Sequence, residues 1–303
     1  MKRTALLMSC LLLISAVAQG EDDLPSARSV LERYFAMPLP AGLDKAFQAR
    51  VAVLAELKTM PQGAVLASEE VLFNRATSGQ RNEIASALAD YIHTAECAQL
   101  LYRVLKDVRE PENKQAFQEE VLVRSSAVLG LRRMARRTDR SGFKRDPQGP
   151  DFEPKVQGVV PYLIYAASDK SEWIRIFALQ ALADTRDPAA VAELKKCLND
   201  PSWKIRYFAA CFLTEYQDSS GLAEMCKSLN QIQKPQPPED RSYPASIELL
   251  IASFQRITGK SFGEIPMNPM LSSDLNASAK AFKRYQELLH EWEGWCSQQP
   301  NPH

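Results

Sequence analysis

The sequence predicts an all-α fold, an α-solenoid of stacked antiparallel helix pairs, and three observations lead to it. First, the stretch from Ser171 to Asp184 recurs from Ser202 to Glu215, a shift of 31 residues. Second, the apolar residues inside each copy follow helical spacing. Third, 45% of the chain is hydrophobic and 24% is charged, which is enough apolar material for a core of domain size.

Each repeated unit is expected to form two short helices. In the first helix the apolar positions are spaced i, i+3, i+4, i+7 and i+8, as in Ile174, Phe177, Ala178, Ala181 and Leu182. Asp187 and Pro188 are typical of a helix start, with Asp as the N-cap and Pro in the first turn. Neither pair can bury its apolar stripe alone, so neighbouring pairs must stack.

The same pattern extends toward the N-terminus with wider spacing. Arg124 and Arg81 each precede a leucine by seven residues, as Arg175 precedes Leu182. Residues 46–57 and 64–73 have helical periodicity, and we expect them to form a first pair that lacks the arginine. The interval between Arg124 and Arg175 is longer by about twenty residues, so residues 137–156, rich in Gly and Pro, are expected to be a loop inserted between pairs.

Four segments divide the chain. Residues 1–18 are expected to be a signal peptide, 19–230 the solenoid with its insertion, 231–244 a proline-rich linker, and 245–303 a C-terminal helical segment. Within the last segment, helices are expected at 247–257 and 279–295. The second is amphipathic, and either caps the solenoid or docks into a partner.

The first twenty residues resemble a secretory signal. Lys2 and Arg3 precede an apolar run at 5–17, and a small-x-small motif predicts cleavage after Ala18, with Gly20 as the alternative. A lipoprotein box ending at Cys10 is the second interpretation, although the apolar run continues beyond that cysteine. No later segment offers about twenty uninterrupted apolar residues, so we expect no membrane span and a periplasmic or secreted protein.

The repeats resemble those of HEAT-repeat proteins, specifically the short-unit type first described in phycobilisome lyases. The resemblance rests on the stretches Trp173–Ala178 and Lys204–Ala209 and the paired-helix spacing around them, and it covers roughly residues 81–230. The stretch Ile257–Gly263, followed by Trp292 and Trp295, is similar to a closing segment of secreted bacterial HEAT proteins. The resemblance implies a fold and leaves function open, because HEAT proteins include scaffolds, adaptors, lyases and nucleic-acid enzymes.

The recurring arginines have two interpretations. Arg175 and Arg206 could cover apolar surface with their stems and bond carboxylates or carbonyls of an adjacent unit. Alternatively, they could form a row that faces an anionic ligand. Repetition itself favours the structural role, because stacking geometry requires the same contact in every unit.

Catalytic motifs are absent from the sequence. His290 begins a stretch like a zincin helix, but Gly294 stands where the second metal ligand is required, so no metal is expected. The sequence has no nucleophile elbow, phosphate-binding loop or haem motif, and we expect no catalytic residue and no cofactor. Thirty-seven basic residues balance thirty-seven acidic ones, which argues against a nucleic-acid partner.

Five cysteines remain after the signal peptide, so at least one cannot pair within the chain. Folding the repeat about a turn near Asp218 brings Cys211 close to Cys226, which suggests a disulfide between them. Cys197 with Cys226 is the rival pair. In the third interpretation all the cysteines are small buried apolar side chains.

One basic cluster departs from the even charge balance. It lies at the end of the helix that contains Arg124 and at the start of the insertion, and consists of Arg132, Arg133, Arg136, Arg137, Arg140, Lys144 and Arg145. These cations either complement a helix C-terminus or form a docking site for an acidic protein, a phosphate group or an envelope polyanion. We place the candidate contact at Arg136, Arg137, Arg140, Lys144 and Arg145.

The sequence therefore predicts an exported scaffold or adaptor that binds another protein and is not an enzyme. The alternative is an enzyme or cofactor-handling lyase that uses the concave groove of the solenoid. The sequence does not indicate the partner or the oligomeric state.

Overall fold

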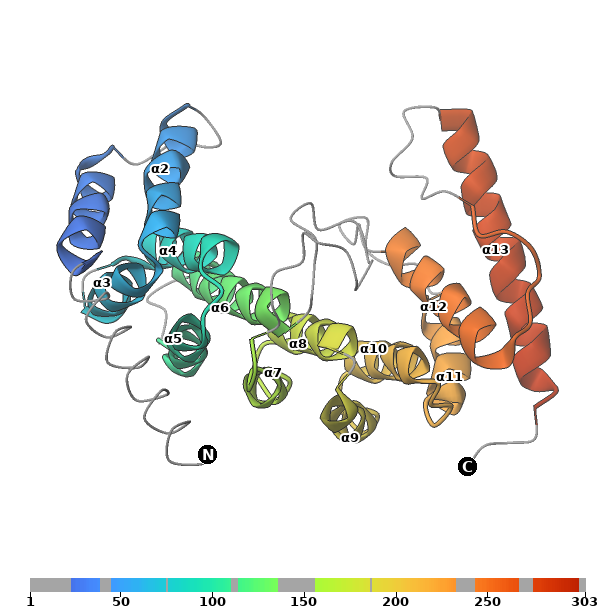
Figure 1. The fold of residues 1–303 in the computed structure, drawn as a ribbon. Helices are drawn as coiled ribbons and strands as arrows, with labels where there is room; N and C mark the ends of the chain where they lie inside the picture. The colour runs from blue at the N-terminus through green and yellow to red at the C-terminus, as the bar shows by residue number, and fades with distance from the viewer. Residues whose placement is uncertain are drawn as a thin grey trace, which may run out of the picture. The chain divides into compact units, whose positions relative to one another are not determined.

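The structure is a computed structural model that describes residues 23–38, 45–74, 76–109, 114–135, 156–185, 187–232, 243–266 and 275–299. Over these ranges the secondary structure is helical and contains no strand, which confirms the all-α solenoid predicted from the sequence (Figure 1). The chain divides into two compact units, Met1–Asp184 and Thr185–His303, which are described separately.

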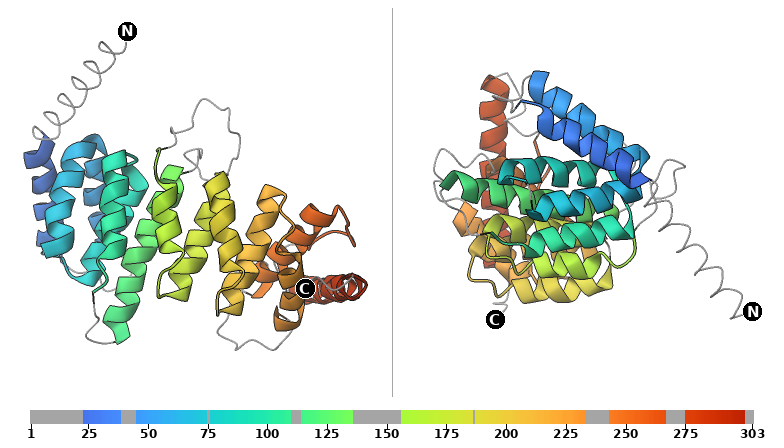
Figure 2. Two further views of the ribbon diagram at one scale, coloured as in Figure 1. Left: turned by 90° about the horizontal axis from the view of Figure 1, so that it is seen from below. Right: turned by 90° about the vertical axis from the view of Figure 1, so that its left-hand side faces the viewer.

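Unit 1 is built from consecutive helix pairs. A helix at residues 23–36 is followed by α2 (Lys45–Ala55), the 3-10 turn η1 (Glu56–Thr59), α3 (Pro61–Asn74), α4 (Ser78–Tyr91), α5 (Ala95–Lys106), α6 (Lys114–Ala135), α7 (Val160–Ala166) and α8 (Glu172–Thr185). We call the first helix of each pair its A helix and the second its B helix. The A helices α4, α6 and α8 follow one another in one row, and the B helices α5 and α7 lie in a second row (Figures 1 and 2).

Polar residues start the helices of unit 1 where the sequence changes from loop to apolar stripe. Thr77 accepts a hydrogen bond from the Gln80 backbone while the Gln80 side chain accepts one from the Thr77 backbone, a capping box that begins α4. Thr94 accepts from the Cys97 backbone at the start of α5. Because the first turn of a helix has unpaired N–H groups, these side chains fix where each helix begins.

The predicted apolar stripe of α8 is largely confirmed. Ile174, Ala178, Ala181 and Leu182 are fully buried. Phe177, predicted to lie in the same stripe, is only half-buried. Its ring therefore lies at the border between the core and the exposed side of the A helices.

Unit 2 contains α9 (Pro188–Cys197), α10 (Trp203–Leu213), the 3-10 turn η2 (Thr214–Tyr216), α11 (Leu222–Ile232), α12 (Tyr243–Thr258) and α13 (Leu275–Ser297). Asp187 accepts a hydrogen bond from the Ala189 backbone and Pro188 occupies the first turn of α9, as expected from the sequence. Its core extends from Tyr207 on α10 to Trp292 on α13.

The C-terminal helix α13 caps unit 2. Its apolar face, formed by Tyr285, Leu288, Leu289 and Trp292, is buried in one cluster with α11 and α12. Trp292 stacks on Phe254 at 4.6 Å between ring centroids. The apolar face is therefore covered within the chain, and the capping interpretation is confirmed over the docking one.

Two glycines shape the segment between α12 and α13. Gly259 and Gly263 have φ angles of 69° and 114°, where a side chain would be strained. They place the ring of Phe262 4.8 Å from that of Trp292 and aim the Phe262 carbonyl at the Arg284 guanidinium, 2.5 Å away. The glycines and tryptophan singled out in the sequence thus meet in one closing structure.

Candidate functional site

Five A helices carry an arginine at the same position, followed by apolar residues three, four and seven positions later. They are Arg50 on α2, Arg81 on α4, Arg124 on α6, Arg175 on α8 and Arg206 on α10. The expectation that the first pair lacks this residue was wrong. Arg50 precedes Arg81 by 31 residues, the interval of the C-terminal repeats, and is followed by Val53, Leu54 and Leu57 in place of the Phe-Ala phrase.

In unit 1 the first three arginines are buried and bind a carboxylate of the next helix pair. Arg50 Nε lies 3.1 Å from Glu83 on α4, and its Nη1 donates to the Tyr34 and Met37 carbonyls. Arg81 Nη1 donates to both carboxylate oxygens of Glu120 on α6, at 2.7 and 2.8 Å.

Arg124 continues the series. Its Nη1 donates to both oxygens of Asp169, at 2.5 and 2.6 Å, and both side chains are nearly fully buried. Asp169 lies in the turn before α8 and also accepts from the Ser171 backbone at 2.7 Å. The same carboxylate therefore shapes the turn and ties two consecutive pairs together.

Arg175 and Arg206 bind the turn that precedes their own helix. Arg175 Nη1 donates to the carbonyls of Asp169 and Lys170, at 2.9 and 3.3 Å. Arg206 repeats this in unit 2 with Asp200 and Pro201, and its Nε lies 2.7 Å from Glu224 on α11. Because these guanidinium groups bind carboxylates and carbonyls of the chain itself, the structure favours the structural interpretation over a row facing an anionic ligand.

The exposed side of the A helices in unit 1 is a separate surface, which we call the A-face. Helical geometry puts on it the side chains two positions before the recurring arginine and two, five and nine positions after it. On α4, α6 and α8 these are Glu83, Ser86, Asp90, Leu122, Ser126, Leu129, Arg133, Trp173, Phe177, Gln180 and Asp184.

A cavity of about 290 Å³ opens on the A-face between α2 and α4. Its lining is apolar on α2 and mixed on α4, and consists of Val51, Leu54, Asn82, Glu83, Ser86, Ala87, Asp90 and Tyr91. Both carboxylates in the lining are already paired, Glu83 with Arg50 and Asp90 with Arg133. The cavity therefore offers apolar contact and neutral polar groups.

Two large apolar side chains are exposed at equivalent positions of the A-face. Leu122 on α6 and Trp173 on α8 each stand two residues before the recurring arginine, and they are 52% and 55% exposed. Tryptophan is enriched in protein interfaces, which makes this pair a candidate contact. This is the apolar part of the candidate site.

The end of the insertion, at Val156, lies against α6. The Val156 backbone donates to the Met134 carbonyl at 2.9 Å, which joins the end of the insertion to the last turn of α6. Two arginines of the basic cluster lie in that turn, where Arg132 pairs with Asp184 at 2.5 Å and Arg133 pairs with Asp90. These two cations join neighbouring A helices.

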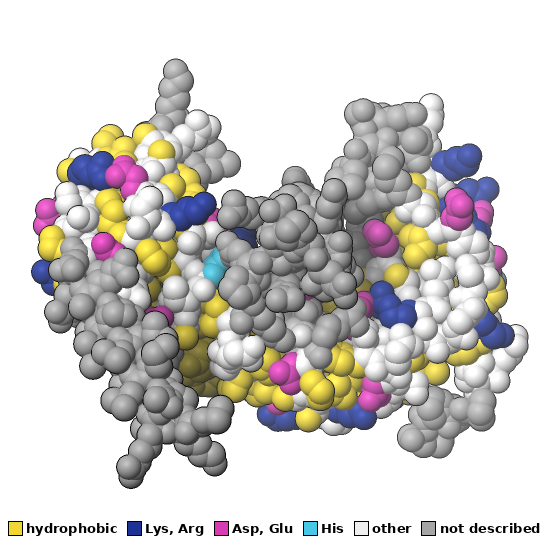
Figure 3. Space-filling model, in the orientation of Figure 1, with side chains coloured by type: hydrophobic (Ala, Val, Ile, Leu, Met, Phe, Trp, Pro, Cys, Tyr) yellow, Lys and Arg dark blue, Asp and Glu magenta, His cyan; other side chains and the backbone are white. Residues whose placement is uncertain are grey.

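The five cations assigned from the sequence as the contact, Arg136, Arg137, Arg140, Lys144 and Arg145, lie outside the described residues. Figure 3 shows basic and acidic side chains interspersed with apolar ones over the described surface that faces the viewer. This face therefore carries charges of both signs, whereas the basic cluster is a run of like charges in the sequence.

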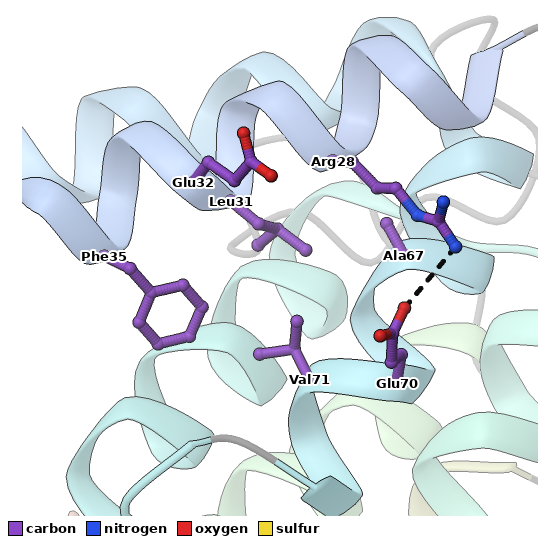
Figure 4. Close-up of a pocket in the computed structure, with 7 residues that line it drawn as sticks. All are labelled: Arg28, Leu31, Glu32, Phe35, Ala67, Glu70 and Val71. Atoms are coloured by element: carbon purple, nitrogen blue, oxygen red, sulfur yellow. Dashed lines mark hydrogen bonds and ion pairs between the residues drawn. The ribbon is translucent and has the colours of Figure 1, made fainter.

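A second cavity, of about 210 Å³, lies between the helix at 23–36 and α3 (Figure 4). Leu31, Ala67 and Val71 form its apolar base. Arg28 and Glu70 face each other at the rim, 3.4 Å apart. Glu32 also lines the cavity, so its charged lining consists of this pair and one further carboxylate.

The disulfide differs from the expected pair. Cys226 on α11 is bonded to Cys296 on α13, so the predicted bond between Cys211 and Cys226 was wrong, as was the rival Cys197–Cys226 pair. Cys211 is a fully buried thiol in the core of unit 2. The capping helix α13, whose position linear spacing along the repeat does not reveal, supplies the partner of Cys226.

Metal binding and membrane insertion each require features that are missing from the described ranges. Within them, no group of three His, Cys, Asp or Glu side chains is arranged to hold a metal ion. In the same part of the chain, none of the helices combines the length and apolar character of a membrane span.

The fold and the recurring arginines define a helical-repeat protein. Residues 155–242, a range that includes α7 to α11, match the family model for HEAT repeats. A search of curated proteins found no match to the chain. The resemblance seen in the repeated phrases is thus confirmed at the level of HEAT repeats for this stretch.

Proposed function

We propose that this protein is an exported adaptor that binds an acidic segment of another protein on the A-face of unit 1 and carries out no chemistry of its own. HEAT repeats generally serve as scaffolds for protein interaction. The observation that carries the proposal is the exposure of Leu122 and Trp173 at equivalent positions of successive A helices. Such paired apolar groups offer a partner the same contact twice.

The charge of the partner is inferred from the insertion. It begins directly after α6, whose last turn holds Arg132 and Arg133, and residues 136–145 add five cations against a single acid, Asp139. Since long insertions need not obey the stacking pattern, they are suited to recognition. A partner that contacts Leu122 on α6 and also reaches the insertion must extend past the end of the helix at Ala135, about 20 Å away at 1.5 Å per helical residue.

Export is supported by two independent features. The first twenty residues have the charge, apolar run and cleavage motif of a secretory signal. Disulfides such as Cys226–Cys296 persist in oxidising compartments. We therefore propose a periplasmic or secreted location, and the closing segment around Gly259 and Trp292 suggests the exported bacterial type of HEAT protein.

The second candidate is a cofactor-handling lyase of the phycobilisome-lyase-like type, which the cavity between α2 and α4 would serve. Its volume, about 290 Å³, falls at the lower end of ordinary ligand sites. Absorption spectra and metal analysis of the purified mature protein separate the two functions. A bound chromophore or stoichiometric metal would favour the lyase.

The adaptor proposal is tested by reversing the charge of the insertion. In one variant Arg137, Arg140 and Arg145 become Glu. In a matched control three exposed lysines of unit 2, Lys227, Lys280 and Lys283, become Glu, which changes the net charge by the same amount. Immobilised wild type and both variants are exposed to an extracytoplasmic extract of the native host at several salt concentrations.

Wild type and the control variant should retain the same protein, and the insertion variant should retain less of it. The difference should be largest at low salt, where charge attraction is least screened. Circular dichroism verifies that all three proteins are folded. Equal retention by all three at every salt concentration would refute a role for the cluster.

A further inference from the structure

The native disulfide raises the question of whether the cysteines pair before or after the chain folds. The cysteines of the mature chain occur in the order Cys97, Cys197, Cys211, Cys226 and Cys296, and the bond joins the last two. A chain oxidised as it emerges, N-terminus first, would pair the first two and then Cys211 with Cys226. That sequence of events leaves Cys296 without a partner.

Chain entropy makes the same wrong pair favourable in an unfolded chain. Cys226 is 15 residues from Cys211 and 70 from Cys296. Because the probability of loop closure falls with the 3/2 power of loop length, Cys226 meets Cys211 about ten times more often than Cys296. The native pair therefore requires something that removes Cys211 from the competition.

The folded structure does this by burial. Cys97, Cys197 and Cys211 are all buried, whereas Cys226 and Cys296 are each partly accessible. Cys211 lies in the core of unit 2 next to Tyr207 and Ser253, and Cys97 lies inside α5. Burial also raises the pKa of the Cys97 and Cys211 thiols to about 12, which suppresses the thiolate that would react.

Docking of α13 brings the native pair together. Trp292, fully buried against Phe254, lies one helical turn before Cys296 on the same side of α13. With that turn seated, the Cα atoms of Cys226 and Cys296 are 5.8 Å apart. This separation lies inside the range that a disulfide spans.

We infer that the Cys226–Cys296 bond forms after unit 2 has folded, by exchange with the disulfide of a thiol-oxidising agent, and that α13 docking selects the pair. The thiolate of one cysteine attacks the oxidant's disulfide and forms a mixed disulfide, releasing one oxidant thiolate. The second cysteine, as thiolate, then attacks the mixed disulfide and releases the other. Two electrons pass from the client sulfurs to the oxidant, which leaves as a dithiol after taking up the two protons. The inference rests on the exported location in the proposed function, but not on the binding surface.

The test varies the order of folding and oxidation for the full mature chain. In the first arm, reduced and urea-unfolded protein is diluted to refold and then receives oxidised glutathione as the probe oxidant. In the second arm, the oxidant is added in urea before dilution. Peptide mapping without reductant then identifies the linked cysteines.

The first arm should give the Cys226–Cys296 link as the main product. The second should give mainly non-native links, with Cys211–Cys226 about tenfold more abundant than Cys226–Cys296. Equal yields of the native link in both arms, or its absence from the first, would overturn the inference. A failure of the adaptor proposal would leave this result unchanged.

A variant tests the selecting step. Trp292→Ala keeps every cysteine and removes the side chain that seats the last turns of α13. In the refold-first arm it should form the native link several-fold more slowly than wild type. A native link formed at the wild-type rate would overturn the role of docking, and if the variant does not fold, the wild-type comparison still decides the order.

Discussion

The two units secure their helices in different ways. Unit 1 joins consecutive pairs through buried arginines, each of which reaches a carboxylate of the next pair: Arg50 to Glu83, Arg81 to Glu120, and Arg124 to Asp169. Unit 2 closes instead with stacked aromatic rings and the Cys226–Cys296 bond. The ion pairs link each helix pair of unit 1 to the next one, whereas the aromatic cluster and the disulfide close the C-terminal end of unit 2.

This difference shows what a buried ion pair contributes here. Removing two charges from water costs nearly as much as their attraction returns, so such pairs add little net stability, and we expect their main effect to be to disfavour misaligned stacking. A repeat with similar apolar stripes needs that discrimination at each step. The last repeat has no successor, and its apolar end is simply covered by α13.

The largest effect is expected for Arg81→Ala. The change leaves the buried Glu120 carboxylate without its counter-charge and should lower the free energy of unfolding of unit 1 by about 3 to 5 kcal/mol. Urea unfolding followed by circular dichroism measures this. Arg33→Ala, which breaks an exposed pair with Glu56, serves as the control, and equal effects of the two changes would contradict the assigned role.

The next effect is expected for the double change Cys226→Ser and Cys296→Ser. The bond closes a loop of about 70 residues, so its loss should destabilise unit 2 by roughly 2 to 4 kcal/mol. Hydrogen exchange should show faster exchange in α13 and unchanged protection in α4 and α6. An equal increase of the exchange rate in unit 1 would contradict the view that the disulfide stabilises only unit 2.

A smaller effect is expected for Phe177→Ala. A fully buried phenylalanine costs about 3 to 5 kcal/mol when truncated. Because Phe177 is half-buried on the A-face, its loss should cost less than that range and less than Ile174→Ala in the buried stripe of the same helix. Thermal unfolding of both variants checks the order, and the reverse order would place Phe177 in the core.

Sequence patterns revealed the repeat period, the paired helices, the start of α9 and the capping helix, because each depends on residues close in the chain. Arg50 was missed although it meets the same criterion, since it precedes Leu57 by seven residues as Arg81 precedes Leu88. The partner of Cys226 was missed for another reason. Cys296 reaches α11 only because α13 packs against α11 and α12, and local spacing carries no information on that packing.

The smallest effect on stability is expected for Trp173→Ser, and it separates stability from binding. The side chain is mostly exposed, so the unfolding free energy should change by no more than about 0.5 kcal/mol. Retention of the partner from an extracytoplasmic extract should nevertheless fall several-fold. Tyr165→Ser on the B helix α7 is the control and should retain the partner normally.

The most direct test of the adaptor proposal is site-specific photo-crosslinking. A benzophenone amino acid replaces Trp173 on the A-face in one protein and Tyr165 on the B helix in another, since both side chains are exposed, at 55% and 41%. After irradiation in an extracytoplasmic extract of the native host, position 173 should give a single prominent crosslinked protein and position 165 should not. Crosslinking of the same protein only from position 165, or equally from both, would contradict binding on the A-face.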